Sequence, residues 1–120
     1  MMENNIILQK TIEFSTTIIK VGEQLKEKNN YILANQLIRS GTAIGAMVHE
    51  AQSAESRLDF LHKLKIADKE ASETMYWVTL LERTEPKFER EIRVQLMDIR
   101  RLLGSIIMTC RKRLSENGTK

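Results

Sequence analysis

The amino-acid sequence predicts an all-α fold, a single antiparallel up-down-up-down four-helix bundle over residues 1–120. Three features indicate this fold: long amphipathic segments, few helix breakers and short polar connections. The chain has one Pro and five Gly in 120 residues, a length that suits one hydrophobic core. Its abundant Ile, Leu, Ala, Glu, Lys and Arg favour helices over strands.

The first helix is expected over about residues 5–28, where core-forming side chains recur at spacings of three and four. The side chains of this stripe are Ile7, Thr11, Phe14, Ile18, Val21 and Leu25. Asn29 and Asn30 follow the helix. They predict a short turn, because Asn tolerates left-handed backbone and caps helices well.

The second helix is expected over about residues 31–52, with Asn30 as its N-cap. Gly41 and Gly45 lie four residues apart and therefore share one face of this helix. Each Gly costs roughly 1 kcal/mol of helix stability relative to Ala. We therefore expect a neighbouring helix to pack closely against this face.

The third helix is expected over about residues 57–83. Ser56 and Asp59 resemble a capping box at its start, with Asp in place of the preferred Glu. Its apolar stripe alternates spacings of four and three, which is typical of a helix in a bundle core. The residues of this stripe are Phe60, Leu64, Ala67, Ala71, Thr74, Val78 and Leu81.

The fourth helix is expected over about residues 87–114, with Pro86 in its first turn, where no N–H is needed. Its apolar stripe contains Phe88, Ile92, Leu96, Ile99, Leu103, Ile106, Cys110 and Leu114. Residues 115–120 form a polar tail that is expected to fray. Because the connections are short, neighbouring helices are expected to run antiparallel.

Two stretches of the chain form a recognisable two-part motif. Residues 37–51 read Leu-Ile-Arg-Ser-Gly-Thr-Ala-Ile-Gly-Ala-Met-Val-His-Glu-Ala, and residues 60–77 carry a Phe…Leu…Ala…Glu-Ala…Glu-Thr…Tyr-Trp series. In spacing and order the motif resembles the bacterial four-helix-bundle proteins named for intervening sequences in 23S ribosomal RNA genes. Its structural residues are Arg39, Ser40, Gly41, Gly45, Glu50, Glu70, Glu73 and Trp77.

The resemblance implies assembly into a homopentamer of bundles. It also implies kinship with the accessory variability determinant of diversity-generating retroelements, which binds nucleic acid and a reverse transcriptase through a basic surface. The chain departs from the family pattern at Ala43 and Met47, where the family usually has Ser and Asn. Roles that depend on those two polar side chains are therefore not carried over.

Charge is distributed unevenly along the chain. Residues 1–86 hold 10 Lys and Arg against 12 Asp and Glu, whereas residues 87–120 hold nine against four, a net charge of +5. An anionic partner is therefore expected to bind the last quarter of the chain. The candidate nucleic-acid contacts there are Lys87, Arg90, Arg93, Arg100, Arg101, Arg111, Lys112 and Arg113.

Two interpretations of this basic helix remain open. Arrays of Lys and Arg bind nucleic-acid phosphates, and the release of counterions supplies affinity; self-assembly would multiply the charge. The alternative is a solvated face that Glu89, Glu91 and Asp98 partly neutralise. The cations at positions 111–113 can also complement the helix dipole.

The carboxylates suit ion pairing better than metal binding. A di-metal bundle needs Glu-x-x-His pairs, but Glu70 is followed at this spacing by Glu73, and neither His49 nor His62 follows a Glu in this way. We therefore expect no metal and no cofactor. Arg39 is instead expected to pair with Glu70 or Glu73 across the second and third helices.

The reactive and aromatic side chains also have structural interpretations. Cys110 lies on the apolar stripe without a His base partner, so we expect a buried hydrophobe rather than a nucleophile. Tyr76 and Trp77 are expected at the core edge or at a subunit interface, with base stacking as the alternative. A single Cys, no leader-like pattern in residues 1–10 and no apolar run of about 20 residues indicate a cytoplasmic protein.

The sequence therefore predicts a non-catalytic binding protein, because it has no phosphate-binding Gly-rich loop and no Cys/His metal spacing; the resemblance implies in addition that this protein is a homo-oligomer. The first hypothesis is a nucleic-acid-binding or adaptor protein that uses the fourth helix to bind RNA or DNA. The second is a structural or protein-partner module without nucleic-acid binding. A small-ligand or metal-binding bundle is the third.

Overall fold

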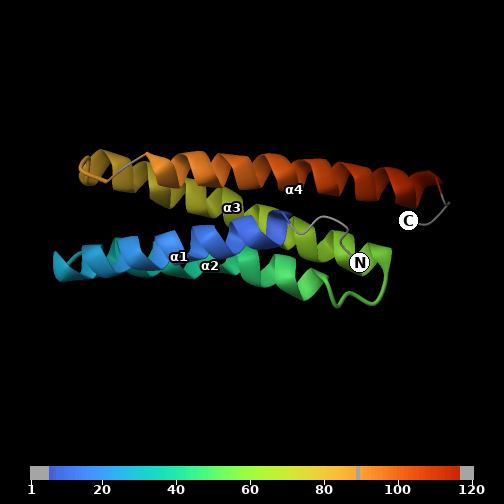
Figure 1. Cartoon of the computed structure of the whole chain (residues 1–120), viewed down its shortest axis with the longest axis horizontal. Helices are drawn as coiled ribbons and strands as arrows, with labels where there is room; N and C mark the ends of the chain where they lie inside the picture. The colour runs from blue at the N-terminus through green and yellow to red at the C-terminus, as the bar shows by residue number, and fades with distance from the viewer. Residues whose placement is uncertain (1–5, 89, 117–120) are drawn as a thin grey trace.

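The protein folds into four long helices, as seen in a computed structural model that describes residues 6–88 and 90–116. The helices are α1 (Ile6–Glu27), α2 (Tyr31–Ala51), α3 (Arg57–Thr84) and α4 (Glu91–Glu116). They run side by side in alternating directions and form a rod of 53 × 21 × 21 Å (Figure 1). The predicted all-α four-helix bundle is confirmed.

Each helix packs against two neighbours around one core. Helices α1 and α3 both pack directly against α2 and α4, whereas in the described residues the diagonal pairs α1–α3 and α2–α4 have no Cα atoms within 8 Å of each other. The stripes predicted for the first and third helices are buried throughout. None of the described helices is long and apolar enough to cross a membrane.

The turn between α1 and α2 forms as its two asparagines predict. Asn29 has a φ of 66°, and its N–H donates to the carbonyl oxygen of Lys26 at 2.9 Å. The N–H of Asn30 donates to the carbonyl oxygen of Leu25 at 2.8 Å, which completes a Schellman motif. Asn30 also occupies the N-cap position of α2, but its side chain makes no capping hydrogen bond. That part of the prediction is wrong, because its ψ of 70° departs from the extended backbone that side-chain capping requires.

Ser56 caps α3 as predicted. Its Oγ accepts a hydrogen bond from the N–H of Asp59 at 3.0 Å. The carboxylate of Asp59 in turn accepts a hydrogen bond from the N–H of Glu55 at 3.1 Å. The return bond of this capping box therefore reaches the residue before the N-cap rather than the N-cap itself.

Helix α4 begins and ends later than predicted. Its first residue is Glu91, and Pro86 lies in a turn instead of in the first helical turn. The N–H of Phe88 donates to the carbonyl oxygen of Glu85 at 3.1 Å, and its ring is partly buried against the core. The ring of Phe88 therefore packs against the core from this turn, whereas the sequence predicted that Phe88 belongs to the fourth helix. The helix continues to Glu116, so the tail predicted to fray is helical there; residues 5 and 117–120 lie outside the described residues.

In the second half of α4 the buried residue is Ile107, not the predicted Ile106. Both positions fit the apolar spacing, because Ile106 lies three residues after Leu103 and four before Cys110, whereas Ile107 lies four after and three before. Ile106 is partly buried and packs against the core.

Helices α1 and α2 meet at three glycines. A Cβ atom at Gly45 would lie 3.0 Å from Cβ of Thr11, and one at Gly41 would lie 3.1 Å from an isoleucine of α1. The neighbouring helix expected at these glycines is thus α1. A Cβ atom at Gly22 of α1 would lie 2.5 Å from Cδ1 of Ile38. Gly22 was not predicted, because a single Gly has no spacing that marks a contact.

We predict that Gly45→Val lowers the free energy of unfolding by about 1–3 kcal/mol, because the added methyl groups crowd Thr11. Gly104 in α4 is the matched control, since a Cβ atom there would meet nothing within 4 Å. Gly104→Ala should raise the free energy of unfolding by about 1 kcal/mol through helix propensity. Urea unfolding followed by circular dichroism measures both. A Gly45→Val protein as stable as the parent would contradict the close contact.

Candidate nucleic-acid interface

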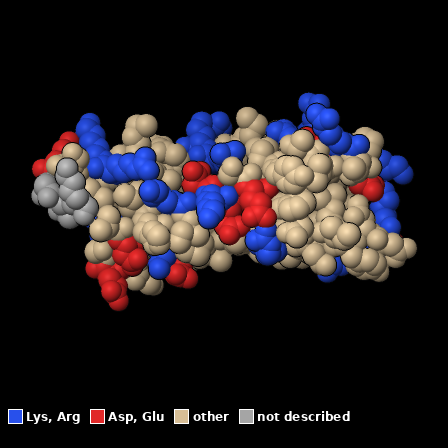
Figure 2. All heavy atoms as spheres, turned by 180° about the vertical axis from the view of Figure 1, so that it is seen from behind, with Lys and Arg blue, Asp and Glu red and all other residues tan. Residues whose placement is uncertain are grey.

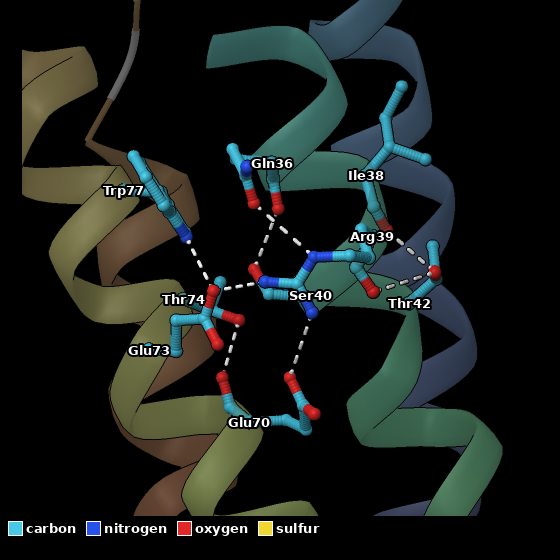
Figure 3. Close-up of polar contacts among 9 residues, drawn as sticks. All are labelled: Gln36, Ile38, Arg39, Ser40, Thr42, Glu70, Glu73, Thr74 and Trp77. Carbon is cyan, nitrogen blue, oxygen red and sulfur yellow. Dashed lines mark hydrogen bonds and ion pairs between the residues drawn. The ribbon is translucent and has the colours of Figure 1, made fainter. Parts of the chain in front are cut away.

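Arg39 connects α2 to α3 through a network of polar side chains (Figure 3). Its Nη2 pairs with Oε2 of Glu73, its Nη1 lies 3.6 Å from Oε1 of Glu70, and its Nε donates to Oε1 of Gln36 at 3.3 Å. Oε2 of Glu73 also accepts a hydrogen bond from Nε1 of Trp77 at 3.1 Å. The ion pair expected for Arg39 is therefore present, and it includes both Glu70 and Glu73.

This network holds two helices together and leaves little to bind a ligand. The Arg39 side chain is half exposed, but its guanidinium faces two carboxylates of its own chain. Oε1 of Glu70 is buried and makes no hydrogen bond in the described part of the chain, and the guanidinium of Arg39 is the cation that lies beside it. Ser40 is fully buried, and its hydroxyl donates to the backbone oxygen of Gln36 at 2.9 Å.

Glu50 also joins α2 to α3. Its Oε1 lies 3.1 Å from Nζ of Lys63, which lies 3.7 Å from Oδ1 of Asp59. The hydrogen bond with Glu50 raises the pKa of Lys63. Across residues 6–88 and 90–116, no three His, Cys, Asp or Glu side chains gather as a metal site requires. The structure thus gives Glu50 a cation partner, Lys63, that the sequence did not indicate.

The guanidinium of Arg93 contacts α3 and therefore does not extend freely into solvent, as a nucleic-acid contact would have to. Its Nε and Nη2 each donate to the carboxylate of Glu82 at 2.9 Å, and Nη2 also donates to Oγ1 of Thr79 at 2.9 Å. The hydrogen bond from Arg93 lowers the pKa of Glu82. We therefore assign Arg93 to the α3–α4 contact and remove it from the candidate nucleic-acid contacts.

Further ion pairs join the remaining neighbours. Oδ2 of Asp98 lies 2.6 Å from Nζ of Lys10, which lowers the pKa of Asp98, and its Oδ1 lies 3.0 Å from Nη2 of Arg101. Nζ of Lys28 lies 2.5 Å from Oε1 of Glu85. Within the described residues, α1–α2 is the one neighbouring pair of helices without a cross-helix ion pair, and there the glycines meet instead.

The cations without an ion pair concentrate on one side of the bundle. Among the described residues, all of them except Lys20 and Lys26 lie on α3, on α4 or in the turn between them. Figure 2 shows Lys and Arg side chains along the upper edge, which α3 and α4 form in Figure 1. These cations are Arg57, Lys65, Lys69, Arg83, Lys87, Arg90, Arg100, Arg111, Lys112 and Arg113.

The structure changes the set of candidate contacts in three ways. Arg93 leaves the set, and Arg101 stays in it, because its side chain is 71% exposed although it pairs with Asp98. Lys65 and Lys69 of α3 join the set. They were not predicted because the net charge was summed along the sequence, and Asp and Glu outnumber Lys and Arg in residues 1–86. Their spacing of four residues on an exposed helix face was the available signal.

Cys110 and Trp77 take structural positions. The thiol of Cys110 is buried with Sγ 3.7 Å from the carbonyl oxygen of Arg57, and burial raises its pKa. A raised pKa disfavours the thiolate that nucleophilic chemistry needs. Trp77 is partly buried against the core, and its ring meets that of Tyr76 edge-on, with the centroids 5.0 Å apart.

Comparisons with known proteins agree with this fold. A family model described as 23S rRNA-intervening sequence protein matches residues 3–106. The crystal structure of a protein of unknown function from the S23 ribosomal protein family of Bacteroides thetaiotaomicron is similar to this chain. The two chains share 41% sequence identity and a TM-score of 0.79, with 84% of this chain and 97% of that chain covered. The comparison with curated proteins gives no match.

We predict that Arg93→Ala lowers the free energy of unfolding by about 1–2 kcal/mol, because it leaves the half-buried carboxylate of Glu82 unpaired. Arg101→Ala is the matched control and should change stability by less than about 0.5 kcal/mol, since Arg101 is exposed. Chemical unfolding of both variants measures the difference. Equal effects of the two substitutions would contradict the structural role of Arg93.

The same ion pair predicts a dependence on pH. The folded-state pKa of Glu82 lies below its ordinary value of 4.5, so its stabilising contribution is complete above that value. It is lost as the pH falls through the lower folded-state pKa. We expect the difference in unfolding temperature between the parent and Glu82→Gln to shrink from about pH 7 to about pH 3. A constant difference would show that the carboxylate charge does not matter.

Proposed function

The chain belongs to the 23S rRNA-intervening sequence protein family, and we propose that it is a non-catalytic, homo-oligomeric nucleic-acid-binding protein. The proposal rests on the separation of charge: Arg39, Lys63 and Arg93 pair with carboxylates across helices, whereas most of the described cations without an ion pair lie on α3 and α4. We name the surface that α3 and α4 share the α3–α4 face. The cations that we assign to it are Lys65, Lys69, Arg83, Arg90, Arg100, Arg111, Lys112 and the exposed Arg101, which pairs with Asp98 on its own helix.

The length of the α3–α4 face favours a polymeric anion. From Arg90 to Arg111 the chain advances by about 31 Å at ~1.5 Å per helical residue. A single small anion needs only one or two cations, whereas an extended row of cations matches the repeated phosphates of a polynucleotide. Lys and Arg neutralise these phosphates and release counterions, which supplies affinity without sequence specificity.

Self-association is the second part of the proposal. Ile12 and Ile19 lie seven residues apart on α1, and both are exposed. With Ala46 of α2 they line a shallow groove of about 250 Å³ beside Gly45. Covering this apolar surface with a second copy would remove it from water and bring several basic faces into one particle. Light scattering should therefore give a mass several times the 13.9 kDa of one chain; a monomer would contradict this part.

We predict that the parent protein binds a labelled oligouridine of about 12 nucleotides, and that affinity falls about fifty-fold between about 50 and 200 mM salt for about four phosphate contacts. The triple variant Arg90→Ala, Arg101→Ala, Lys112→Ala should bind at least about tenfold more weakly. The control removes two cations, Lys20 and Lys26 of α1, which have no ion pair in the described part of the chain, and it should stay within about twofold of the parent. Fluorescence anisotropy measures all three.

Four results would count against the proposal. Absence of binding at low salt, or an affinity independent of salt, would overturn nucleic-acid binding itself. An equal loss in the α1 control would show that net charge alone governs affinity, which would overturn the assignment to the α3–α4 face. Recovery of one specific protein and no nucleic acid from cell extracts would support the protein-partner module instead.

A further inference from the structure

A hollow of about 370 Å³ lies between α3 and α4 within the α3–α4 face. Gly104 opens it, because this position has no side chain and a Cβ atom there would meet nothing within 4 Å. The hollow is therefore space that the packing of the two helices leaves unfilled. The polar and exposed residues around Gly104 are Lys65, Asp68, Lys69, Met108 and Arg111.

The hollow is positively charged from both sides. Lys65 and Lys69 of α3 and Arg111 of α4 have no ion pair in the described part of the chain. Asp68 is the single acidic residue in the lining. Cations on two helices can therefore approach one bound anion from opposite sides, an arrangement that a single basic helix cannot provide.

Apolar side chains lie exposed among these cations. Met108 lines the hollow with 71% of its surface exposed. Met97, which is 51% exposed, lies seven residues before Gly104 and so continues the same stripe of α4. Tyr76 of α3 is also exposed and lies seven residues after Lys69. Thioethers and aromatic rings are polarizable groups that pack well against flat π systems.

We infer that this hollow binds single-stranded nucleic acid, with phosphates on Lys65, Lys69 and Arg111 and an unstacked base against Met108. The inference rests on the proposed function and names its ligand class. A duplex keeps its bases stacked and presents mainly phosphates and sugars to a flat basic face, so it would leave the hollow around Gly104 empty. A single strand turns its bases outward, and they pack on side chains beside the cations.

The test separates filling of the hollow from loss of charge. Gly104→Leu places an apolar side chain in the hollow and keeps every charge, and its Cβ atom would meet nothing within 4 Å. It should weaken binding of the oligouridine about tenfold and leave binding of a duplex of equal length within about twofold. Lys65→Ala with Lys69→Ala should weaken oligouridine binding about tenfold. Val94→Leu, an exposed substitution on α4 away from the hollow lining, is the control and should change neither affinity.

Each of the following results would contradict a specific part of the inference. If the parent binds oligouridine and Gly104→Leu binds it equally well, the hollow is not the binding site, although the proposed function stands. If Gly104→Leu weakens duplex and single strand alike, selectivity for single strands is wrong. A poly-glutamate peptide that displaces oligouridine at equal charge concentration would show that the hollow selects charge only. If the parent binds neither nucleic acid, the proposed function fails together with this inference.

Discussion

The close approach of α1 and α2 at their glycines is the constraint on which the rest of the bundle depends. A side chain at Gly41 or Gly45 would crowd α1. Glycine destabilises α2 at these positions relative to alanine, but it allows the axes of α1 and α2 to lie close together. With α2 held against α1, the opposite side of α2 contacts α3. There Arg39 pairs with Glu70 and Glu73, and Glu50 pairs with Lys63. Arg93 then holds α4 on α3.

These contacts also determine where charge remains for a partner. Each cross-helix pair uses a carboxylate that would otherwise neutralise a nearby cation, and most cations without such a pair lie on the α3–α4 face. Arg93 and Arg101 illustrate the distinction on one helix. The first donates hydrogen bonds from both Nε and Nη2 to a partly buried carboxylate and stabilises the fold, whereas the second is largely exposed and contributes little to folding.

Much of the fold was predictable, because the helical period is a local property of the chain. The stripes from Ile7 to Leu25 and from Phe60 to Leu81 are buried as their spacing indicates. The burial of Ile107 in place of Ile106 was not predictable, because both positions fit the spacing of three and four between Leu103 and Cys110. The hollow at Gly104 was not predictable either, since it forms between helices whose lining residues lie far apart in the sequence.

The central claim is that the α3–α4 face, and not the α1–α2 side, receives nucleic acid. Methyl NMR of methionine-labelled protein tests it most directly, because methyl signals remain visible in large assemblies and the methionines sample both sides. On titration with oligouridine, the methyl signals of Met97 and Met108 on α4 should shift, while that of Met47 on α2 should stay in place. A shift of Met47 with Met97 and Met108 unchanged, or no shift at all, would contradict the account.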